Sequence, residues 1–315
     1  MKKILIIRFS SLGDIILSFP LINALKKEYP ESEIHYLTKS VYKSIVELHP
    51  LVSKLILFSD EPLSRLRSEI QKEKYDLVLD IHKNFRSVSL TLFSGLKVNR
   101  YKKETIKKFF LVKFKINLFK EIIPVYLKYI RAGGKGFSDK YKKFTSSNLR
   151  FDELKKYDFN YTVVAPSSKH FTKTYPRERF ARLINNLQYR AILVGDKTEK
   201  DNKICKYIEE NTEAINMCGK FDYNQLANLL YNSDYVITND SAILHFSEAL
   251  GKKVRAFFGS TVKEFGFFPQ LEESKVFENK NLKCRPCTHI GLPACPLGHF
   301  KCMNELKIDT TNLEN

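Results

Sequence analysis

The sequence has no long uninterrupted apolar run. A helix that spans a bilayer needs roughly 18 or more apolar residues in succession, and no stretch of this chain approaches that length. The first apolar run, Ile4 to Ile7, is followed by Arg8 and Asp14 and by no small-residue cleavage site, so we expect no secretory signal. We therefore expect a cytoplasmic protein, whose six cysteines would be thiols or metal ligands rather than disulfides.

Two phosphate-binding motifs are absent as well. The chain contains neither G-x-G-x-x-G nor the Walker A pattern, which disfavours a dinucleotide-binding enzyme of that type and a P-loop NTPase. No recognisable nucleic-acid-binding motif is present either, so we expect no nucleic-acid partner.

Acidic residues are scarce relative to basic ones. The chain has 53 Lys or Arg against 35 Asp or Glu, a net charge of +18. Residues 100–143 hold fourteen Lys or Arg and three acids, so this segment carries +11 of the total. Aromatic and aliphatic residues are interleaved with these charges, a pattern typical of basic amphipathic helices on anionic membrane surfaces. A solvated basic face over ordinary core contacts explains the segment equally well.

Strand-like and helix-like segments alternate along the chain. This alternation predicts parallel sheets with right-handed crossovers, and continuous β-branched runs are typical of buried parallel strands. The expected strands lie at 3–8, 33–37, 54–58, 76–81, 161–165, 191–195, 235–238 and 254–258. The expected helices lie at 14–28, 40–48, 62–73, most of 103–131, a segment starting at Pro176, 198–211, 224–231 and 241–250.

Proline, glycine and polar residues divide this pattern. Pro20 should kink or restart the first helix, and Pro124 should break the basic helical segment. Residues 131–136 are expected as a flexible loop and residues 145–158 as an interdomain linker.

The length of 315 residues suits two domains. We expect an N-terminal α/β domain over residues 1–150 and a C-terminal α/β domain over residues 158–315. Two such parallel sheets facing each other would form a cleft, which is a common place for ligands.

The first strand leads into a candidate catalytic residue. The apolar run is followed by Arg8 and a small-residue turn, and Asp14 stands where the next helix begins. Loops at the carboxyl ends of parallel strands are where open α/β sheets bind ligands. His82, Lys83 and Arg86 follow the strand that ends at Ile81 in the same way. The alternative for Asp14 is a helix-capping role without any ligand.

A second strand end predicts an anion site. The strand 235–238 runs into Asn239, Asp240 and Ser241, and a helix opens at once. The backbone N–H groups and the dipole of such a helix suit a diphosphate. The alternative is that these three residues are simply preferred N-caps. His245 lies one helical turn after Ser241 on the same face, a position at which a lone histidine is more often structural.

Two further segments carry residues suited to a nucleotide. Lys173 lies in the loop after the strand that ends at Ala165, where a lysine can act as a point charge on a phosphate. Asp196 and Glu199 follow the strand at 191–195, where a carboxylate can accept ribose hydroxyls. Each has an ordinary alternative, since surface lysines are usually solvated and acids are favoured in the first turn of a helix.

In combination these motifs resemble those of the bacterial ADP-heptose:lipopolysaccharide heptosyltransferases, glycosyltransferase family 9. The resemblance covers about residues 3–305, and the ordered set is far more specific than any single motif. Its members are Ser10-Ser11-Leu12-Gly13-Asp14-Ile15 with Pro20, Lys173-Thr174-Tyr175-Pro176, Asn239-Asp240-Ser241 with His245, and Ala249-Leu250-Gly251 through Phe258-Gly259-Ser260-Thr261.

The resemblance implies a GT-B fold, with an acceptor domain followed by a nucleotide-sugar domain, and an inverting transfer that needs no catalytic metal or other cofactor. Asp14 would be the general base and Lys173 would contact the diphosphate. Donor contacts would also come from Ser167, Ser168, Glu199, Asp240, Ser241, Ala242 and His245. Ala242 departs from the family, which usually has glycine there and so more room for the diphosphate.

The implied partners are ADP-heptose, a lipid A–core glycolipid and the anionic inner face of the inner membrane, where the enzyme would be peripheral. Ser11 and Gly13 join His82, Lys83 and Arg86 as expected acceptor contacts. Two rivals stay open: another enzyme on the same scaffold, such as an epimerase or a transferase that uses a different nucleotide-sugar, and a basic, zinc-stapled RNA-binding protein.

The last part of the chain is rich in cysteine. Cys284, Cys287, Cys295 and Cys302 are spaced closely enough to hold a structural zinc ion. The spacing is not that of a standard zinc ribbon, and similar tails occur in family members of the heptosyltransferase II type. The alternative is a reduced, cysteine-rich loop.

Overall fold

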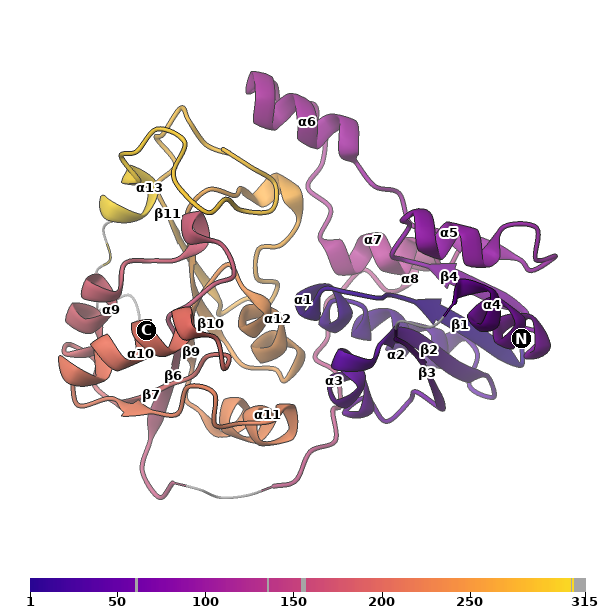
Figure 1. The fold of residues 1–315 in the computed structure, drawn as a ribbon, viewed down its shortest axis with the longest axis horizontal. Coiled ribbons are helices and arrows are strands. Elements are labelled where there is room, and N and C mark those ends of the chain that lie inside the picture. Colours follow the sequence, from indigo (N-terminus) through magenta and orange to yellow (C-terminus); the bar gives the residue numbers. More distant parts are fainter. Residues whose placement is uncertain (60–61, 135, 154–156, 307, 309–315) are drawn as a thin grey trace. The chain divides into compact units, whose positions relative to one another are not determined.

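The computed structural model describes residues 1–59, 62–134, 136–153, 157–306 and 308 and contains two compact α/β units (Figure 1). Unit 1 comprises Met1–Lys103 and Pro124–Arg150, and unit 2 comprises Glu104–Ile123 and Phe151–Asn315.

Unit 1 is built on a five-stranded parallel sheet of order β3-β2-β1-β4-β5. Its central strand is completely buried from Ile4 to Ile7, as the continuous apolar run predicts. The strand order reverses between β1 and β4, and open α/β sheets bind ligands outside the carboxyl ends at such a point. The strands are β1 (Lys3–Ile7), β2 (Glu33–Lys39), β3 (Lys54–Phe58), β4 (Leu77–Asp80) and β5 (Val98–Arg100).

Prolines lie at the starts of some helices of unit 1. Pro20 lies in the first turn of the second helix, where its missing N–H is tolerated, and Pro124 immediately precedes a later helix. The expected restart at Pro20 is therefore confirmed, whereas the basic helical segment is already broken at Phe114, well before Pro124. The helices are α1 (Leu12–Ile16), α2 (Phe19–Glu28), η1 (Ser40–Tyr42), α3 (Lys43–Glu47), α4 (Leu63–Lys72), α5 (Phe85–Thr91), α7 (Val125–Arg131) and α8 (Phe137–Lys140).

Unit 2 is built on a six-stranded parallel sheet of order β11-β10-β9-β6-β7-β8, which reverses between β6 and β9. The strands are β6 (Tyr161–Ala165), β7 (Arg190–Leu193), β8 (Ile215–Asn216), β9 (Val236–Asn239), β10 (Val254–Phe258) and β11 (Lys275–Glu278). The helices are α6 (Thr105–Phe114), η2 (Phe171–Lys173), α9 (Arg177–Ile184), α10 (Glu199–Glu210), α11 (Tyr223–Asn232), α12 (Ala242–Ala249), η3 (Lys263–Phe265) and α13 (Lys301–Asn304).

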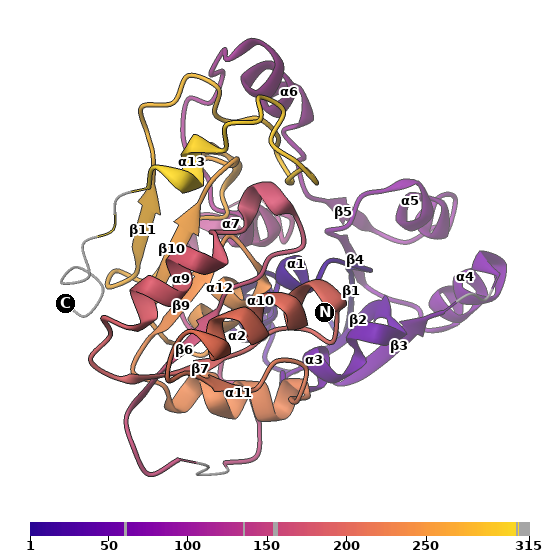
Figure 2. The ribbon, with the colours of Figure 1, turned by 60° about the vertical axis from the view of Figure 1, so that its left-hand side comes forward.

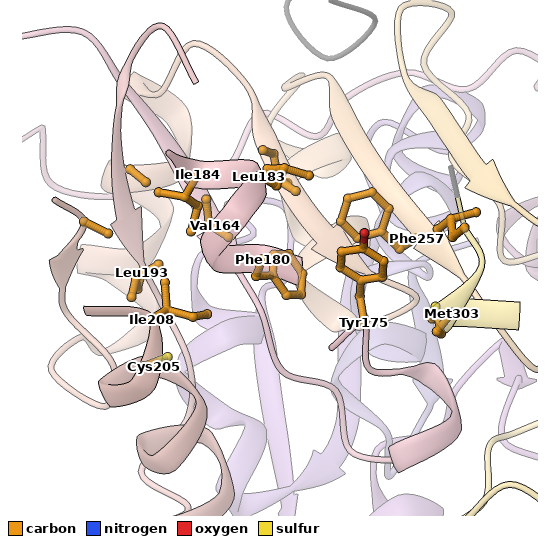
Figure 3. Packing of buried hydrophobic residues seen from close by; sticks show 14 of the residues in the cluster. Val164, Tyr175, Phe180, Leu183, Ile184, Leu193, Cys205, Ile208, Phe257 and Met303 are labelled. Carbon is orange, nitrogen blue, oxygen red and sulfur yellow. The ribbon is translucent and has the colours of Figure 1, made fainter. Parts of the chain in front are cut away.

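Aromatic rings and aliphatic side chains fill the core of unit 2. The ring of Tyr175 lies 4.7 Å from that of Phe257 and 5.2 Å from that of Phe180, measured between centroids (Figure 3). Met303 of α13 joins the same cluster, so α13 packs into the core of this unit. Helices α9 and α10 lie side by side (Figure 2).

The segment 104–123 departs from the expected domain boundaries, because it packs with unit 2 rather than within residues 1–150. The Lys115 ammonium donates hydrogen bonds to the carbonyl oxygens of Cys284 (3.0 Å) and Pro286 (2.6 Å). The Lys108 ammonium lies 6.0 Å from the ring centroid of Phe265. Contacts with residues far along the chain thus decide where this segment belongs.

Other expectations also need correction. The segment 103–131 is less helical than expected, since residues 115–124 between α6 and α7 form no helix. Lys135 in the expected loop 131–136 and residues 154–156 in the expected linker 145–158 lie outside the described residues. In the part of the chain that the structure describes, every helix is too short or too polar to cross a membrane.

Glu248 on α12 is a buried acid in unit 2. Its Oε1 accepts hydrogen bonds from the backbone N–H groups of Gln270 (2.6 Å) and Leu271 (2.7 Å). Burial disfavours the carboxylate and raises the pKa of Glu248 to about 7, although these hydrogen bonds oppose the shift. The protonated side chain therefore stabilises the fold below the ordinary glutamate pKa, and this contribution is lost as the pH rises through 7.

We expect Glu248→Gln to remove this pH dependence, because glutamine keeps the accepting oxygen and never ionises. Between pH 4.5 and 7 the free energy of unfolding of the wild type should fall by about 3 kcal/mol relative to that of the variant. Urea denaturation across this pH range measures the difference, and parallel pH profiles for the two proteins would contradict the assignment.

Candidate functional site

The loop after β1 positions the carboxylate of Asp14 in unit 1. Asp14 lies in the first turn of α1. Its carboxylate contacts Arg8 Nη2 at 2.7 Å and accepts hydrogen bonds from Ser11 Oγ at 2.8 Å and the Tyr129 hydroxyl at 3.0 Å. The Ser11 backbone N–H also approaches it at 3.4 Å. The hydrogen bond from the Ser11 N–H is the contact that a helix-capping role predicts. The three shorter contacts come from side chains.

Arg8 is the buried partner of this carboxylate and connects two strand ends. Its side chain is only 8% exposed, and Nη1 donates a hydrogen bond to the carbonyl oxygen of Ile81 at 2.7 Å. Its guanidinium also lies 5.5 Å from the ring centroid of Tyr129. Because Ile81 directly follows β4, Arg8 joins the two strands between which the sheet order reverses.

The electrostatics of this loop keep Asp14 ionised. Burial alone raises the pKa of the carboxyl, but the Arg8 charge and the hydrogen bonds from Ser11 and Tyr129 outweigh it, so the pKa of Asp14 lies below its ordinary value. Burial and the nearby Arg8 charge lower the pKa of His82 to about 4. At neutral pH the loop therefore holds one carboxylate and one guanidinium, and the neutral imidazole of His82 lies beside it.

The expected acceptor residues after β4 are organised by a buried acid that the sequence analysis missed. Asp80 Oδ1 accepts hydrogen bonds from the backbone N–H groups of Lys83 (2.7 Å) and His82 (3.2 Å), and Oδ2 lies 3.3 Å from Arg100 Nε. The structure brings His82 close to the Asp14 loop, since its ring lies 5.1 Å from that of Phe9. The side chains of Lys83 and Arg86 are exposed, and Gly13 lies in the first turn of α1 next to Asp14.

In unit 2 three strand ends meet around Asp240, at the reversal of the second sheet. Asp240 is buried, and its Oδ2 lies 2.7 Å from Lys173 Nζ and accepts a hydrogen bond from Thr261 Oγ1 at 2.6 Å. The Ser168 hydroxyl, which follows β6, donates to the Asp240 carbonyl oxygen at 3.4 Å. Lys173, Ser168 and Asp240 are thus brought together as expected, whereas Thr261 was expected only as part of a motif.

The side chain before α12 does not cap the helix as the simple capping hypothesis expects. Ser241 occupies the N-cap position but makes no side-chain capping hydrogen bond, and its hydroxyl pairs with Thr238 Oγ1 at 3.0 Å. Asn239 instead supports the neighbouring loop, accepting from the Tyr175 N–H at 2.9 Å. Ala242 is the first helical residue. A strand end built in this way suits an anion at the helix N-terminus.

The other residues expected to contact the donor fall into two groups. Some lie in or near the loop cluster around Asp240, and Glu199 lies exposed on α10. Ser167 Oγ donates to Asp201 Oδ1 at 2.6 Å, and Lys200 Nζ donates to the Ser168 carbonyl oxygen, so both serines belong to the same loop cluster. His245 is buried on α12, with its ring 6.0 Å from that of Phe267. The Glu199 side chain is 81% exposed and pairs with Lys203 one turn along α10.

Positive charge surrounds this loop cluster. Burial, followed by the charges of Lys173, Lys169 and Lys200, lowers the pKa of His170. The histidine therefore stays neutral at neutral pH while three lysines supply the charge. Such a surrounding favours an anionic ligand.

The structure does not show the expected zinc site. All six cysteines are free, and the Cys287 thiol donates a hydrogen bond to the carbonyl oxygen of Cys284 at 3.3 Å. Among the described residues, which include Cys284, Cys287, Cys295 and Cys302, no three His, Cys, Asp or Glu side chains are arranged to hold a metal ion. Burial raises the pKa of Cys302 to about 11, so its thiol is protonated at neutral pH in the metal-free protein.

We expect Arg8→Met to raise the pKa of Asp14, because the largest interaction that favours its charged form disappears. Loss of one partner of this buried pair should also lower the free energy of unfolding by about 3 kcal/mol, the low end of the usual range. A ¹³C NMR titration of the Asp14 carboxyl measures the pKa. Arg86→Met, which removes an exposed arginine of the same unit, is the control, and an equal Asp14 pKa in both variants would refute the assigned role of Arg8.

The chain is similar to known proteins over most of its length. The model of glycosyltransferase family 9 (heptosyltransferase) matches residues 63–296. Lipooligosaccharide heptosyltransferase 2 of Campylobacter jejuni is 27% identical over 317 residues, which cover 94% of this chain and 92% of that protein. Lipopolysaccharide heptosyltransferase 1 of Campylobacter coli is 26% identical and covers 82% of this chain and 84% of its own length.

A solved structure shows the same fold. The structure of E. coli ADP-heptose lipopolysaccharide heptosyltransferase II matches with a TM-score of 0.71 at 21% identity and covers 97% of this chain and 98% of that chain. The expected α/β fold of GT-B type, with two Rossmann-like units, is therefore confirmed.

Proposed function

The chain belongs to glycosyltransferase family 9, the heptosyltransferases, and on this premise we propose that it transfers heptose from ADP-heptose to the inner core of lipopolysaccharide. The transfer would invert the anomeric centre and use no catalytic metal. The observation that carries the proposal is the carboxylate of Asp14, held ionised at the end of β1 by Arg8, Ser11 and Tyr129.

Unit 2 is proposed to bind the donor. Lys173 would exchange part of its pairing with Asp240 for the diphosphate, and the N-terminal N–H groups of α12 would face the same charge. As the bond between the anomeric carbon and the ADP oxygen breaks, these groups would stabilise the leaving diphosphate. Ser167, Ser168, Ser241, Ala242 and His245 would contact the diphosphate and heptose, and Glu199 would contact the ribose.

Unit 1 is proposed to bind the acceptor and supply the base. Asp14 would take the proton from the acceptor hydroxyl while the hydroxyl oxygen attacks the anomeric carbon. The exposed Lys83 and Arg86, with Ser11, Gly13 and His82, would bind a phosphorylated lipid A–core acceptor. The lowered pKa of Asp14 makes it a weak base in the free protein. An approaching acceptor phosphate and the loss of water around the carboxylate would raise that pKa.

We expect Asp14→Asn to bind ADP as the wild type does but to lose most turnover, roughly 10²- to 10⁴-fold, because general base catalysis contributes about that much. Calorimetric ADP binding and ADP release during transfer give the two measurements. Asp76→Asn is the control, since Asp76 accepts hydrogen bonds from Lys2 and Lys3 at the start of β1. Near-normal turnover of Asp14→Asn would exclude the base role.

The donor is tested by thermal shift against ADP-, UDP- and GDP-sugars. A ligand that binds only the folded state raises its melting temperature, so we expect stabilisation by ADP-heptose above the others. Preferential stabilisation by a UDP- or GDP-sugar would instead support an epimerase or another transferase on this fold.

We also propose that α6 and the residues after it dock on an anionic membrane surface, where the lipid acceptor would be found. Ile106 and Phe109 are 72% and 55% exposed on α6, and Phe114 is 53% exposed at its end. The exposed side chains of Lys113 and Lys120 lie among these apolar groups. Apolar residues flanked by lysines match an interface of acyl chains and anionic headgroups.

For the paired variant Ile106→Ser/Phe109→Ser we expect loss of binding to phosphatidylglycerol vesicles, with unchanged ADP affinity. Vesicle sedimentation measures the binding, which should weaken with salt and be poor for phosphatidylcholine alone. Val41→Ser removes an apolar group that is 69% exposed in unit 1 and serves as the control. Equal loss in this control would refute docking through α6.

A further inference from the structure

Arg285 is a buried arginine in the cysteine-rich tail, the segment 284–302. Its side chain is 4% exposed, and its Nη2 lies 2.8 Å from Glu278 Oε2. The remaining donors are directed at backbone carbonyl oxygens, with Nη1 donating to Asn279 (2.6 Å) and Nη2 to Thr261 (2.8 Å). Nε donates to the carbonyl oxygen of Gly259. One guanidinium therefore holds both ends of the turn after β10.

That turn reaches the proposed diphosphate site directly. Thr261 donates its hydroxyl hydrogen to Asp240 Oδ2, the same oxygen that contacts Lys173. If the turn relaxed, Asp240 would lose this donor and pair more strongly with Lys173. Less of the lysine charge would then be available to an incoming diphosphate.

The tail also holds the loop that carries Lys173, through its neighbour Thr172. The Leu292 N–H donates to Thr172 Oγ1 at 2.9 Å, and the Thr172 N–H donates to the Leu292 carbonyl oxygen at 3.2 Å. The Ser260 hydroxyl contacts Thr172 Oγ1 at 3.0 Å. Thr172 thus links the tail with the turn after β10.

Close packing leaves these loops little room to shift independently. A Cβ added at Gly259 would lie 2.6 Å from the Thr172 carbonyl oxygen, and one added at Gly291 would lie 2.5 Å from His170 Cβ. Gly291 also has a backbone φ of +118°, a conformation that residues other than glycine rarely adopt. The tail and both site loops therefore form one hydrogen-bonded and packed unit.

We propose that the cysteine-rich tail positions the donor diphosphate site, with Arg285 as the positioning residue that acts through Thr261 on the Lys173–Asp240 pair without touching the donor. This inference rests on the proposed donor site and adds a determinant of donor affinity to it. The tail would position the site through the Arg285 guanidinium and through its backbone hydrogen bonds to Thr172.

Arg285→Lys tests the proposal, because lysine keeps the charge but lacks the planar fork that reaches several carbonyl groups at once. We expect ADP affinity to fall about tenfold or more and the donor KM to rise, with the acceptor KM unchanged. Arg255→Lys is the matched control, since Arg255 is also buried in unit 2 and donates to the Glu273 carbonyl oxygen. Equal ADP affinities in the two variants would overturn the proposal, whatever their melting temperatures.

Thr261→Val provides a second test, which remains valid even if Arg285→Lys folds poorly. It removes one hydroxyl at nearly constant volume, and we expect it to lower ADP affinity. In the double variant Arg285→Lys/Thr261→Val the two losses of ADP binding free energy should not add, because both substitutions act on the same contact. Wild-type affinity in Thr261→Val, or fully additive losses, would contradict action through Thr261.

Hydrogen exchange separates failure of this inference from failure of the proposed donor. Arg285→Lys should speed amide exchange at Ser260 and Thr172, and Arg255→Lys should not, whether or not ADP is the ligand. Unchanged exchange at both amides would overturn the positioning role. A wild-type chain that fails to bind ADP but shows this exchange pattern would instead refute the donor assignment alone.

Discussion

The ion pair between Arg8 and Asp14 is the interaction on which the loop after β1 depends. Arg8 is buried, so its charge needs compensation inside the protein. Asp14, the Ile81 carbonyl oxygen and the face of Tyr129 provide it, and these groups belong to α1, the end of β4 and α7. One buried charge thereby fixes three segments around a single carboxylate, which stays ionised because its partners outweigh its burial.

Unit 2 uses the same arrangement at the reversal of its own sheet. A lysine and a buried aspartate pair at 2.7 Å, and neighbouring strand ends supply the supporting contacts. The two pairs differ in what surrounds them. Tyr129 and Ser11 donate to Asp14 and hold its charge in place, whereas Lys169 and Lys200 add to the positive charge that Lys173 places near His170 and so favour an anion. The first pair suits a base, and the second suits a diphosphate.

Much of the fold could be predicted from the sequence, because buried parallel strands are continuous apolar runs. The strands at 54–58, 161–165 and 254–258 have the expected bounds. The short strands β5, β8 and β11 were missed, since their residues are only partly buried and show no such run. Asp14, Lys173 and Asp240 could be found from their positions after strands. Arg8, Asp80, Tyr129 and Thr261 owe their importance to partners far along the chain, so their contacts could not be predicted from the local sequence. The expected zinc site is not seen among the described residues, because close cysteine spacing alone does not fix a metal-binding geometry.

The central claim is that Asp14 acts as a base whose pKa is set by its neighbours, and the pH dependence of transfer tests it most directly. Tyr129→Phe removes the hydrogen bond that the phenol donates to Asp14 at 3.0 Å and leaves the ring over Arg8. Loss of a donor to the charged form raises a carboxyl pKa, so the acidic limb of the profile of kcat/KM against pH should move to higher pH in this variant. An acidic limb that stays at the wild-type position would contradict the account.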